Sequence, residues 1–333
     1  MSRMYKHIPI AVCISALIIL ILDNQTAINS ASEGISICLQ TIIPSLLPTM
    51  VLCGIFRQIA RNESGKWIER LCSILGYPEN GGVFLISSIF GGYPVGAVTV
   101  AEAHEQQQLD QKVAQKMLAY CNNAGPAFIF GICATQFSAM HYTYATWIIH
   151  ILSGIFVGKL MNRNQIFTAP LRNSDSKSIV TIVESSAKSM AYVCIWIILF
   201  RVVINFMNDC LLWILPSWLQ IPFVGIIELS NGAIQLHEIK DEHIRFLVCQ
   251  FILSFGGFCV YLQTASVAKK ISTRLYIPIK GLQGIISIFL GEIYYQIAIN
   301  GVYWYALCIP FVIFIINFKK YNKLYWKIQK YRV

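Results

Sequence analysis

The chain has 333 residues, of which 56% are hydrophobic and only 13% are charged. A soluble globular domain carries about 25% charged residues, so this composition excludes an ordinary soluble protein and predicts an integral membrane protein. The formal net charge is +10, but most basic residues lie at the ends of apolar runs, which indicates membrane topology and argues against a nucleic-acid partner. The 11 cysteines are scattered without a CxxC pattern or a Cys/His ligand spacing, so we expect neither a metal site nor a disulfide framework.

The apolar runs predict a single all-α transmembrane domain covering residues 1–333, with about eight membrane-spanning helices. The first run follows Arg3 and Lys6 and resembles a signal peptide, but we expect it to remain as a helix because further spans follow. Pro44 and Pro48 are expected to kink the second span. The predicted spans are residues 8–22, 35–56, 110–138, 142–160, 186–208, 242–268, 278–298 and 301–317.

Two further stretches are interrupted too early to cross a membrane. Residues 81–108 contain Gly91, Gly92 and Pro94 after a short apolar arm, and residues 216–243 contain the sequence ELSNG. A crossing needs about 20 apolar residues, which neither arm supplies. We therefore predict two re-entrant hairpins, each of which enters and leaves the membrane on one side.

The distribution of basic residues favours these hairpins over full crossings. With the N-terminus in the cytoplasm, eight crossings and two hairpins place every lysine and arginine on the cytoplasmic side except Arg201, Lys240 and Arg245. Basic residues prefer the cytoplasmic side of a membrane. We therefore expect both termini to be cytoplasmic and the basic, aromatic tail 319–333 to lie at the membrane surface.

The order of these elements repeats. Residues 35–160 and 186–298 each contain a span, a hairpin, a broken span and a further span, and the two halves are expected to run in opposite senses. The broken spans are interrupted at NNAGP (122–126) and FGGF (255–258). Inverted repeats whose broken helices meet near the middle of the bilayer are typical of secondary transporters.

The first broken span combines residues that suit a binding site. A break leaves backbone groups without helical partners, so it must line protein or a water-filled cavity. Asn122 and Asn123 supply donors and acceptors, Gly125 removes side-chain bulk, and Pro126 can begin a half-helix whose N-terminus favours anions. The alternative is a kinked helix whose amides bind neighbouring backbone.

Two charged residues have open assignments. Glu228, at the second hairpin tip, is either a proton or cation site or a carboxylate bound to backbone amides. Arg201, in the middle of a span, is either a counter-charge for an anionic solute or a structural residue that snorkels to the interface or pairs with Glu228 or Glu292. Gln263 and Thr264, on the half-helix after the second break, could line the same cavity.

Motifs for catalysis do not occur in the chain. It contains neither a GxSxG nucleophile motif nor a Walker A lysine, and its six histidines form no metal-ligand spacing. We therefore expect a protein that is not an enzyme and that uses no cofactor or metal.

Several stretches together resemble a known family. IIPSLLPTMVL, GGVFLISSIFGGYPVGA, MLAYCNNAGPAFIFG, IIELSNG and LSFGGFCVYLQ are similar, in order and spacing, to sporulation integral membrane proteins of the YlbJ type, which carry a nucleoside-recognition (Gate) domain. The resemblance covers about residues 35–270. It implies a fold like that of concentrative nucleoside transporters, a role in endospore formation, and dipicolinate, a small aromatic dicarboxylate, as solute.

The resemblance also implies which residues form the site. Cys259, Val260 and Tyr261 depart from the small polar residue and the histidine expected of relatives, and Arg201 stands where a small or polar residue is expected. Together with the residues argued above, the expected substrate-binding set is Gly91, Gly92, Tyr93, Pro94, Asn122, Asn123, Gly125, Pro126, Arg201, Glu228, Ser230, Asn231, Gly232, Gly256, Gly257 and Gln263.

Two functions remain open from the sequence. The first is a secondary transporter or facilitator of a small anionic solute, dipicolinate by resemblance, in a cell membrane such as the forespore membrane. The second is a non-transporting scaffold for spore-envelope assembly. Expected partners are the lipid bilayer and the small anionic solute, with a homo-oligomer or sporulation membrane proteins as further candidates and no nucleic acid.

Overall fold

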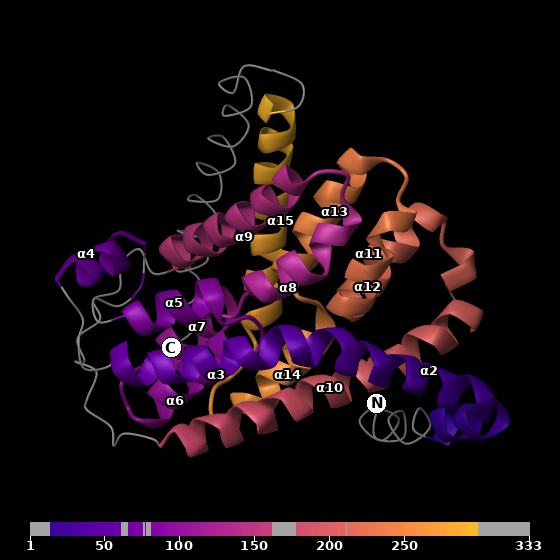
Figure 1. Cartoon of the computed structure of the whole chain (residues 1–333), viewed down its shortest axis with the longest axis horizontal. Coiled ribbons are helices and arrows are strands. Elements are labelled where there is room, and N and C mark those ends of the chain that lie inside the picture. The colour runs from indigo at the N-terminus through magenta and orange to yellow at the C-terminus, as the bar shows by residue number, and fades with distance from the viewer. Residues whose placement is uncertain are drawn as a thin grey trace, which may run out of the picture.

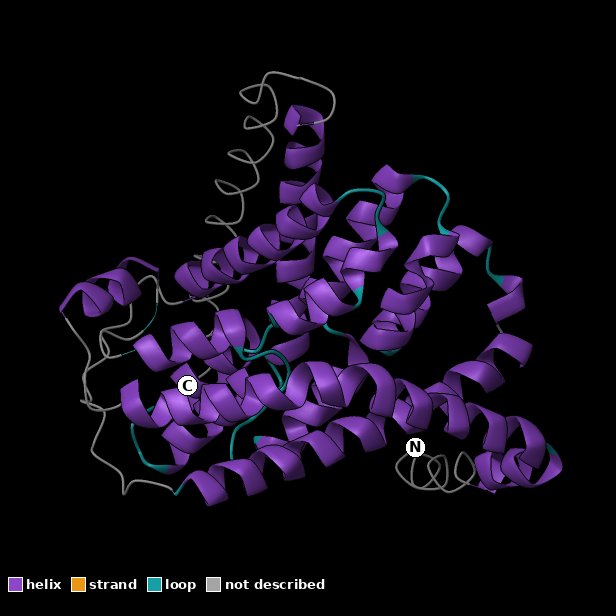
Figure 2. Cartoon of the chain, viewed as in Figure 1, coloured by secondary structure: helices purple, strands orange, loops and turns teal. Residues whose placement is uncertain are grey.

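A computed structural model describes residues 14–60, 66–75, 77, 81–161, 178–210 and 212–298. Within these ranges the regular elements are helices (Figure 2). The first residues of the predicted span 8–22, the predicted span 301–317, the tail 319–333 and most of the polar connection between the two halves lie outside the described residues.

The helices follow one another with short connections. After a helix over residues 14–22, the described elements are α2 (Asn24–Ile37), η1 (Cys38–Ile42), α3 (Ile43–Ala60), α4 (Lys66–Leu75), α5 (Gly82–Phe90), α6 (Val95–Glu105), α7 (Gln111–Tyr120), α8 (Pro126–Gly131), η2 (Cys133–Gln136), α9 (Met140–Met161), α10 (Ile179–Cys210), η3 (Leu212–Ile214), α11 (Ser217–Ile227), α12 (Leu229–Gln235), η4 (Leu236–Glu238), α13 (Glu242–Phe255), α14 (Gly257–Val267) and α15 (Tyr276–Ala298).

Five of the described helical segments are long and apolar enough to cross a membrane. They are Asn24–Ile59, Met140–Met161, Ile179–Asn208, Glu242–Val267 and Tyr276–Ala298. Large apolar side chains such as Leu39, Leu52, Ile195 and Leu199 are exposed on two of them, as expected of helices that face lipid. The prediction of a polytopic all-α membrane protein is confirmed, whereas the predicted number of eight spans stays a prediction.

The second predicted span is longer than expected and contains a π-helical turn. It begins at Asn24 and continues to Ala60, and the π-helical residues Cys38–Ile42 come just before Pro44. Proline has no N–H and its ring clashes with the carbonyl four residues earlier. The wider π register is a common way for a helix to accommodate such a disturbance.

Both predicted hairpins are present as pairs of short helices packed against each other. α5 and α6 flank residues 91–94, and α11 and α12 flank Glu228. The longest arms have 11 residues, which gives a helix of roughly 16 Å. That is about half of a hydrocarbon core of about 30 Å, so these arms are too short to cross.

Corresponding helices of the two halves run antiparallel where they touch. α3 and α10 lie side by side (Figure 1). Along the contacts of α2, η1 and α3 with α10, residue numbers rise on one side and fall on the other. The same holds between α9 and α15 and between the two broken spans. The pairs are Ser30–Asn205, Glu33–Arg201, Cys38–Cys194 and Gly54–Ile182, then His141–Tyr294 and Gly154–Gln283, then Asn122–Thr264 and Ser138–Glu242.

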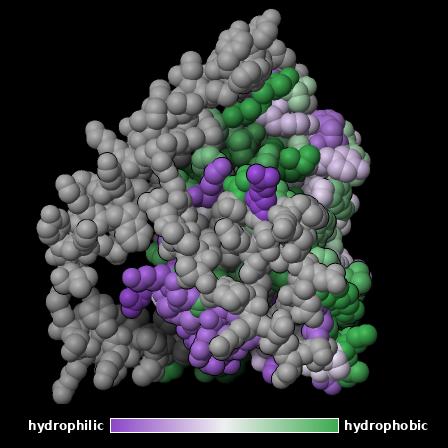
Figure 3. Space-filling view, turned by 90° about the vertical axis from the view of Figure 1, so that its left-hand side faces the viewer, coloured by the Kyte–Doolittle hydropathy of each residue, from purple (hydrophilic) through white to green (hydrophobic). Residues whose placement is uncertain are grey.

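This pairing is what two inverted repeats require, although the boundaries of the repeats stay a prediction. Figure 1 places α5, α6 and α7 on one side and α11, α12 and α13 on the other, with α8 and α14 between them. The turns after α6 and α14 share one end of the molecule, where Glu105 forms an ion pair with Lys270. Figure 3 looks onto this side and shows hydrophilic residues gathered in its lower part.

Candidate functional site

Both hairpin tips, the first break and the half-helix that follows the second break contribute to one cavity. Its volume is about 20 Å³, enough for one water molecule. Both hairpin tips, both broken spans and the long helices α3 and α10 surround it. The lining residues are Ile42, Leu46, Tyr93, Ala124, Gly125, Phe128, Val193, Ile197, Glu228, Leu229, Ser230, Val260 and Gln263.

The tip of the first hairpin packs directly on the first break. Gly92 has a φ of +69°, which glycine adopts at little cost. A Cβ atom at Gly125 would lie 2.9 Å from the Cα atom of Gly92, so the two backbones meet without side chains between them. Tyr93 extends further, and its hydroxyl donates to the carbonyl oxygen of Leu253 at 2.9 Å. This tip therefore joins both broken spans.

The helix start predicted at the first break is present, but the side-chain amides of Asn122 and Asn123 bind protein groups outside the cavity lining. Gly125 is the N-cap and Pro126 the first residue of α8. Asn122 donates to Thr264 at 2.9 Å and to Tyr276 at 3.2 Å, and both atoms lie outside the cavity lining. The side chain of Asn123 donates to the carbonyl oxygen of Tyr120 at 2.7 Å. In this structure both side chains lie outside the cavity lining, because neighbouring protein groups satisfy them. Their role in substrate binding stays a prediction.

His150 satisfies a backbone donor that the break sets free. The Ala124 N–H donates to its Nε2 atom at 2.9 Å, and its Nδ1 atom lies 3.0 Å from the hydroxyl of Ser254. Because Nε2 accepts, the imidazole is neutral and Nδ1 donates to Ser254. The structure shows that His150 connects α9 and the first break to α13.

Lys280 is a buried lysine at the first break that was not among the predicted site residues. The sequence placed it among the basic residues of a cytoplasmic segment, but its side chain is fully buried in α15. Its Nζ atom lies within 3.2 Å of three oxygen atoms on Asn122, Asn123 and Gln283. Because α15 begins at Tyr276, Lys280 lies within this helix and inside the predicted span 278–298, and not in a connecting segment. A buried polar and small-residue stripe at helical spacing could have revealed it: Lys280, Gln283, Gly284, Ser287 and Gly291.

Glu228 caps the second half of its hairpin. Its carboxylate accepts from the backbone N–H groups of Ser230 at 3.0 Å and Asn231 at 2.7 Å, and from the Asn231 amide at 2.8 Å. This is the expected alternative in which the acid is bound to backbone amides. Glu228 is only 2% exposed. Since its carboxylate occupies the N-terminus of α12, that helix end does not offer free donors to a solute.

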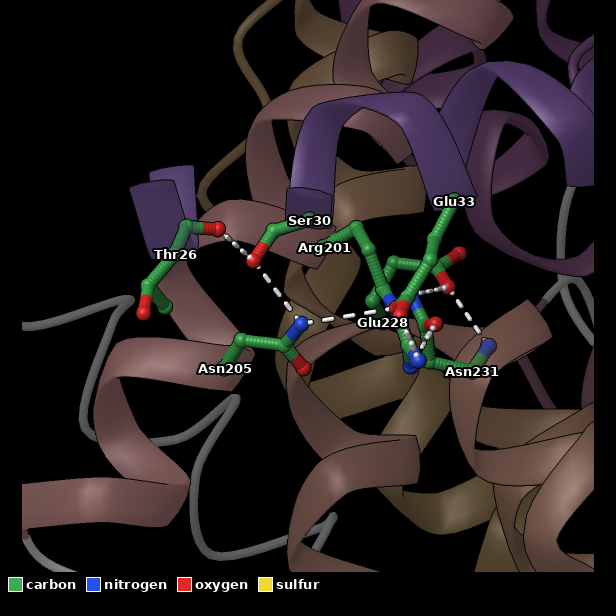
Figure 4. A network of polar contacts seen from close by, with 7 residues as sticks. All are labelled: Thr26, Ser30, Glu33, Arg201, Asn205, Glu228 and Asn231. Carbon is green, nitrogen blue, oxygen red and sulfur yellow. Dashed lines mark hydrogen bonds and ion pairs between the residues drawn. The ribbon is translucent and has the colours of Figure 1, made fainter. Parts of the chain in front are cut away.

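Arg201 belongs to a polar network beside the cavity (Figure 4). Its Nε and Nη2 atoms donate to the Glu33 carboxylate at 3.0 and 2.7 Å, and its Nη1 atom donates to Asn231 at 2.9 Å. The expected pairing with Glu228 or Glu292 is wrong; Glu292 instead binds His243 at 2.6 Å. Arg201 therefore positions the second hairpin tip through Asn231 and does not line the cavity.

The network continues to the surface of α2. Asn205 donates to the hydroxyl of Ser30 at 2.8 Å, and Ser30 donates to the carbonyl oxygen of Thr26 at 2.6 Å. The Glu33 side chain is 52% exposed. A continuous series of polar contacts thus leads from the cavity, through Glu228 and Arg201, to an exposed carboxylate (Figure 4).

The second break mirrors the first in its use of glycine. Gly256 and Gly257 have φ angles of +82° and +81°. A Cβ atom at Gly257 would lie 3.1 Å from the carbonyl oxygen of Gly225, so the second hairpin packs on the second break. Gly232 packs on the Cα atom of Gly225 within the same hairpin. Gln263, on α14, lines the cavity and lies 3.2 Å from the sulfur of Cys259.

The predicted binding residues therefore divide into two groups. Tyr93, Gly125, Glu228, Ser230 and Gln263 line the cavity. The others surround it without lining it: Gly91, Gly92, Pro94, Asn122, Asn123, Pro126, Arg201, Asn231, Gly232, Gly256 and Gly257.

Comparison with known proteins agrees with the resemblance seen in the motifs. The chain is 25% identical over 302 residues to the sporulation integral membrane protein YlbJ of Bacillus subtilis (strain 168), which covers 75% of this chain and 72% of that protein. No family model matches the chain, and no solved structure matches it. The Gate-domain and nucleoside-transporter features implied by the resemblance stay predictions. The similarity supports the YlbJ-like family expected from the sequence.

Proposed function

We propose that this chain is a secondary transporter or facilitator that moves a small anionic solute across a membrane during endospore formation. The observation that carries the proposal is the meeting of both hairpin tips and both broken spans at one cavity. Irregular backbone inside a membrane is tolerated where it lies within protein or lines a cavity. Transporters place substrate sites at such meeting points of broken helices.

The antiparallel arrangement of the two halves of the chain supports movement of one half relative to the other. Corresponding helices run antiparallel, as the contacts Glu33–Arg201 and His141–Tyr294 show. The hairpin tips also pack through glycines, with Gly92 on Gly125 and Gly257 against the carbonyl groups of α11. Contacts without interlocking side chains can separate with little rearrangement. In inverted-repeat transporters, alternating access arises from such relative movement.

The solute implied by the resemblance, dipicolinate, requires the cavity to widen. Ligand pockets usually measure about 300–1,000 Å³, and this cavity measures about 20 Å³. We therefore propose that the hairpin tips move apart when the solute enters. Gly125, Ser230 and Gln263 would then supply polar contacts from three different elements.

The negative charge of Glu228 opposes the binding of an anionic solute. Its carboxylate faces the same cavity, and two negative charges in a site of low dielectric repel each other strongly. We propose that Glu228 takes up a proton when the anion binds, so that solute and proton move together. Replacement by glutamine should then make uptake less dependent on pH, provided the variant retains the fold.

Uptake of labelled dipicolinate into proteoliposomes tests the proposed function. We expect saturable, protein-dependent uptake by the wild type and at least a tenfold reduction in Asn122→Ala/Asn123→Ala, because these amides hold the first break in place. Lys240→Ala, at an exposed loop position, is the matched control and should not change uptake. Absence of protein-dependent flux contradicts the proposed solute, and unchanged flux in the double variant contradicts the role of the break.

A non-transporting membrane scaffold for spore-envelope assembly is the second candidate. The small cavity volume favours it, as does the internal satisfaction of Asn122 and Asn123 by protein groups. A scaffold would keep the hairpin tips packed together at all times. It would then show no flux for any solute, and its cavity would stay closed to reagents from both sides of the membrane.

A further inference from the structure

Lys280 lies in a cradle built only of oxygen acceptors. Its Nζ atom is 3.0 Å from the carbonyl oxygen of Asn122, 3.2 Å from Oδ1 of Asn123 and 2.8 Å from Oε1 of Gln283. A neutral amine has only two N–H groups, and three acceptors require the three N–H groups of an ammonium. The geometry therefore identifies a charged lysine.

Neighbouring contacts fix the orientation of both amides in this cradle. Asn123 Nδ2 donates to the carbonyl oxygen of Tyr120 at 2.7 Å, so its Oδ1 atom must face Lys280. Gln283 Nε2 donates to that same Oδ1 atom at 2.9 Å, which turns its own oxygen toward the ammonium. Exchanging oxygen and nitrogen in either amide would lose these bonds. The acceptors are thus built into the site.

The cradle holds a cation without a carboxylate. Among the described residues, none of the ion pairs includes Lys280, and its Nζ atom also lies 5.3 Å from the centre of the Tyr93 ring. The Asn122 carbonyl belongs to the break that follows α7, which ends at Tyr120. The carbonyl end of a helix carries partial negative charge, and unwound carbonyl groups coordinate monovalent cations in transporters.

We propose that Lys280 is a built-in cation: its ammonium occupies a site whose oxygen donors otherwise suit a small monovalent metal ion. It joins the first break to α15 through Asn122, Asn123 and Gln283, so the protein needs no Na⁺ or K⁺ at this place. This role concerns how the break is held and does not depend on which solute is moved.

Removing the ammonium while leaving space should expose the cation site. Lys280→Ala leaves room for a small cation, whereas Lys280→Met loses the same charge but fills most of the space. The measurement is the apparent melting temperature of each purified protein in choline chloride, NaCl, KCl and ethylammonium chloride at equal ionic strength. Lys240→Ala, at an exposed position, controls for general salt effects.

For the wild type, Lys280→Met and Lys240→Ala, we expect the melting temperature of each protein to be the same in all four salts. Lys280→Ala should melt lower in choline chloride and regain at least half of its loss, saturably, with Na⁺, K⁺ or ethylammonium. A purely structural lysine would show no such rescue. The proposal is overturned if Lys280→Ala aggregates in every salt or responds to none, or if the wild type shows the same saturable shift. Since no solute is added, these outcomes are independent of the transport assay.

Discussion

The first break and the second hairpin tip hold buried charges of opposite sign by opposite means. At the first break, the Lys280 ammonium is bound by a backbone carbonyl and two amide oxygens. At the second tip, the Glu228 carboxylate is bound by two backbone N–H groups and an amide N–H. Neither charge is paired with the other: Glu228 lines the cavity, whereas Lys280 does not.

The difference follows from which end of a helix each break exposes. Lys280 meets the Asn122 carbonyl group, which follows the end of α7, and Glu228 meets the N–H groups at the start of α12. These ends carry partial negative and partial positive charge, respectively. A broken helix in a membrane can therefore stabilise an ion whose charge is opposite to that of the exposed helix end, without an oppositely charged side chain.

The two regions also differ in their connection to the surface. Glu228 is linked through Asn231 and Arg201 to Glu33, whose side chain is 52% exposed. Lys280 is fully buried and its hydrogen-bond partners are buried residues of α15 and the first break. We expect the Glu228 region to respond to the surroundings of the protein and the Lys280 region to act as a fixed support.

The largest loss of stability is expected where an added methyl group would overlap backbone atoms of the first break or of the second hairpin. A Cβ atom at Gly96 would overlap the Cys121 carbonyl of the first break, and one at Gly232 would overlap Gly225 in the second hairpin. Gly96→Ala and Gly232→Ala should each cost about 3 kcal/mol or more of stability. The apparent melting temperature and the yield of folded protein measure this loss.

Gly281→Ala is the matched control, because nothing lies within 4 Å of a Cβ atom at that helical position. It should leave stability unchanged or raise it slightly, since alanine favours helix over glycine by about 1 kcal/mol. Equal tolerance at Gly96, Gly232 and Gly281 would show that the close backbone packing around the breaks is not needed.

A smaller effect is expected from Glu228→Gln. The amide keeps the shape of the side chain but has only one acceptor oxygen, so at least one N–H of the α12 start loses its partner. An unsatisfied buried donor costs about 1–3 kcal/mol, measured as a lower apparent melting temperature. Glu238→Gln, at an exposed position in η4, should have no effect. A Glu228→Gln variant as stable as the wild type would contradict the capping role.

The smallest effect is expected at the surface end of the network. Glu33 is half exposed and its ion pair with Arg201 is partly screened, so their coupling should be about 0.5–1 kcal/mol. A double-mutant cycle with Glu33→Gln and Arg201→Gln measures it through thermal stability. Strictly additive losses would show that the two side chains are not coupled and that the network ends at Arg201.

The hairpins and breaks could be predicted because their residues act locally. Gly92, Gly256 and Gly257 adopt positive φ angles, and Pro126 begins a helix, which glycine and proline favour wherever they occur. Composition and charge likewise predicted the membrane class. These properties depend on short stretches of chain and are visible in the sequence.

The partners of the buried charges could not be predicted in the same way. Arg201 and Glu33 are 168 positions apart, and Lys280 binds residues more than 150 positions earlier in the chain. Lys280 was counted with the cytoplasmic basic residues, although the predicted span 278–298 already contains it. Asn122 and Asn123 were expected at the cavity because a break needs polar partners, but Thr264 and the Tyr120 carbonyl supply them from behind the wall.

The most direct test of a solute cavity at the breaks is the reactivity of a cysteine placed at Ser230, which lines the cavity and is only 4% exposed. The measurement is labelling of Ser230→Cys by a membrane-impermeant maleimide in proteoliposomes, with the native cysteines replaced. We predict labelling from both sides of the membrane, slowed saturably by dipicolinate and not by an uncharged analogue. A cysteine that is unreactive from both sides, or whose labelling dipicolinate leaves unchanged, would contradict the account.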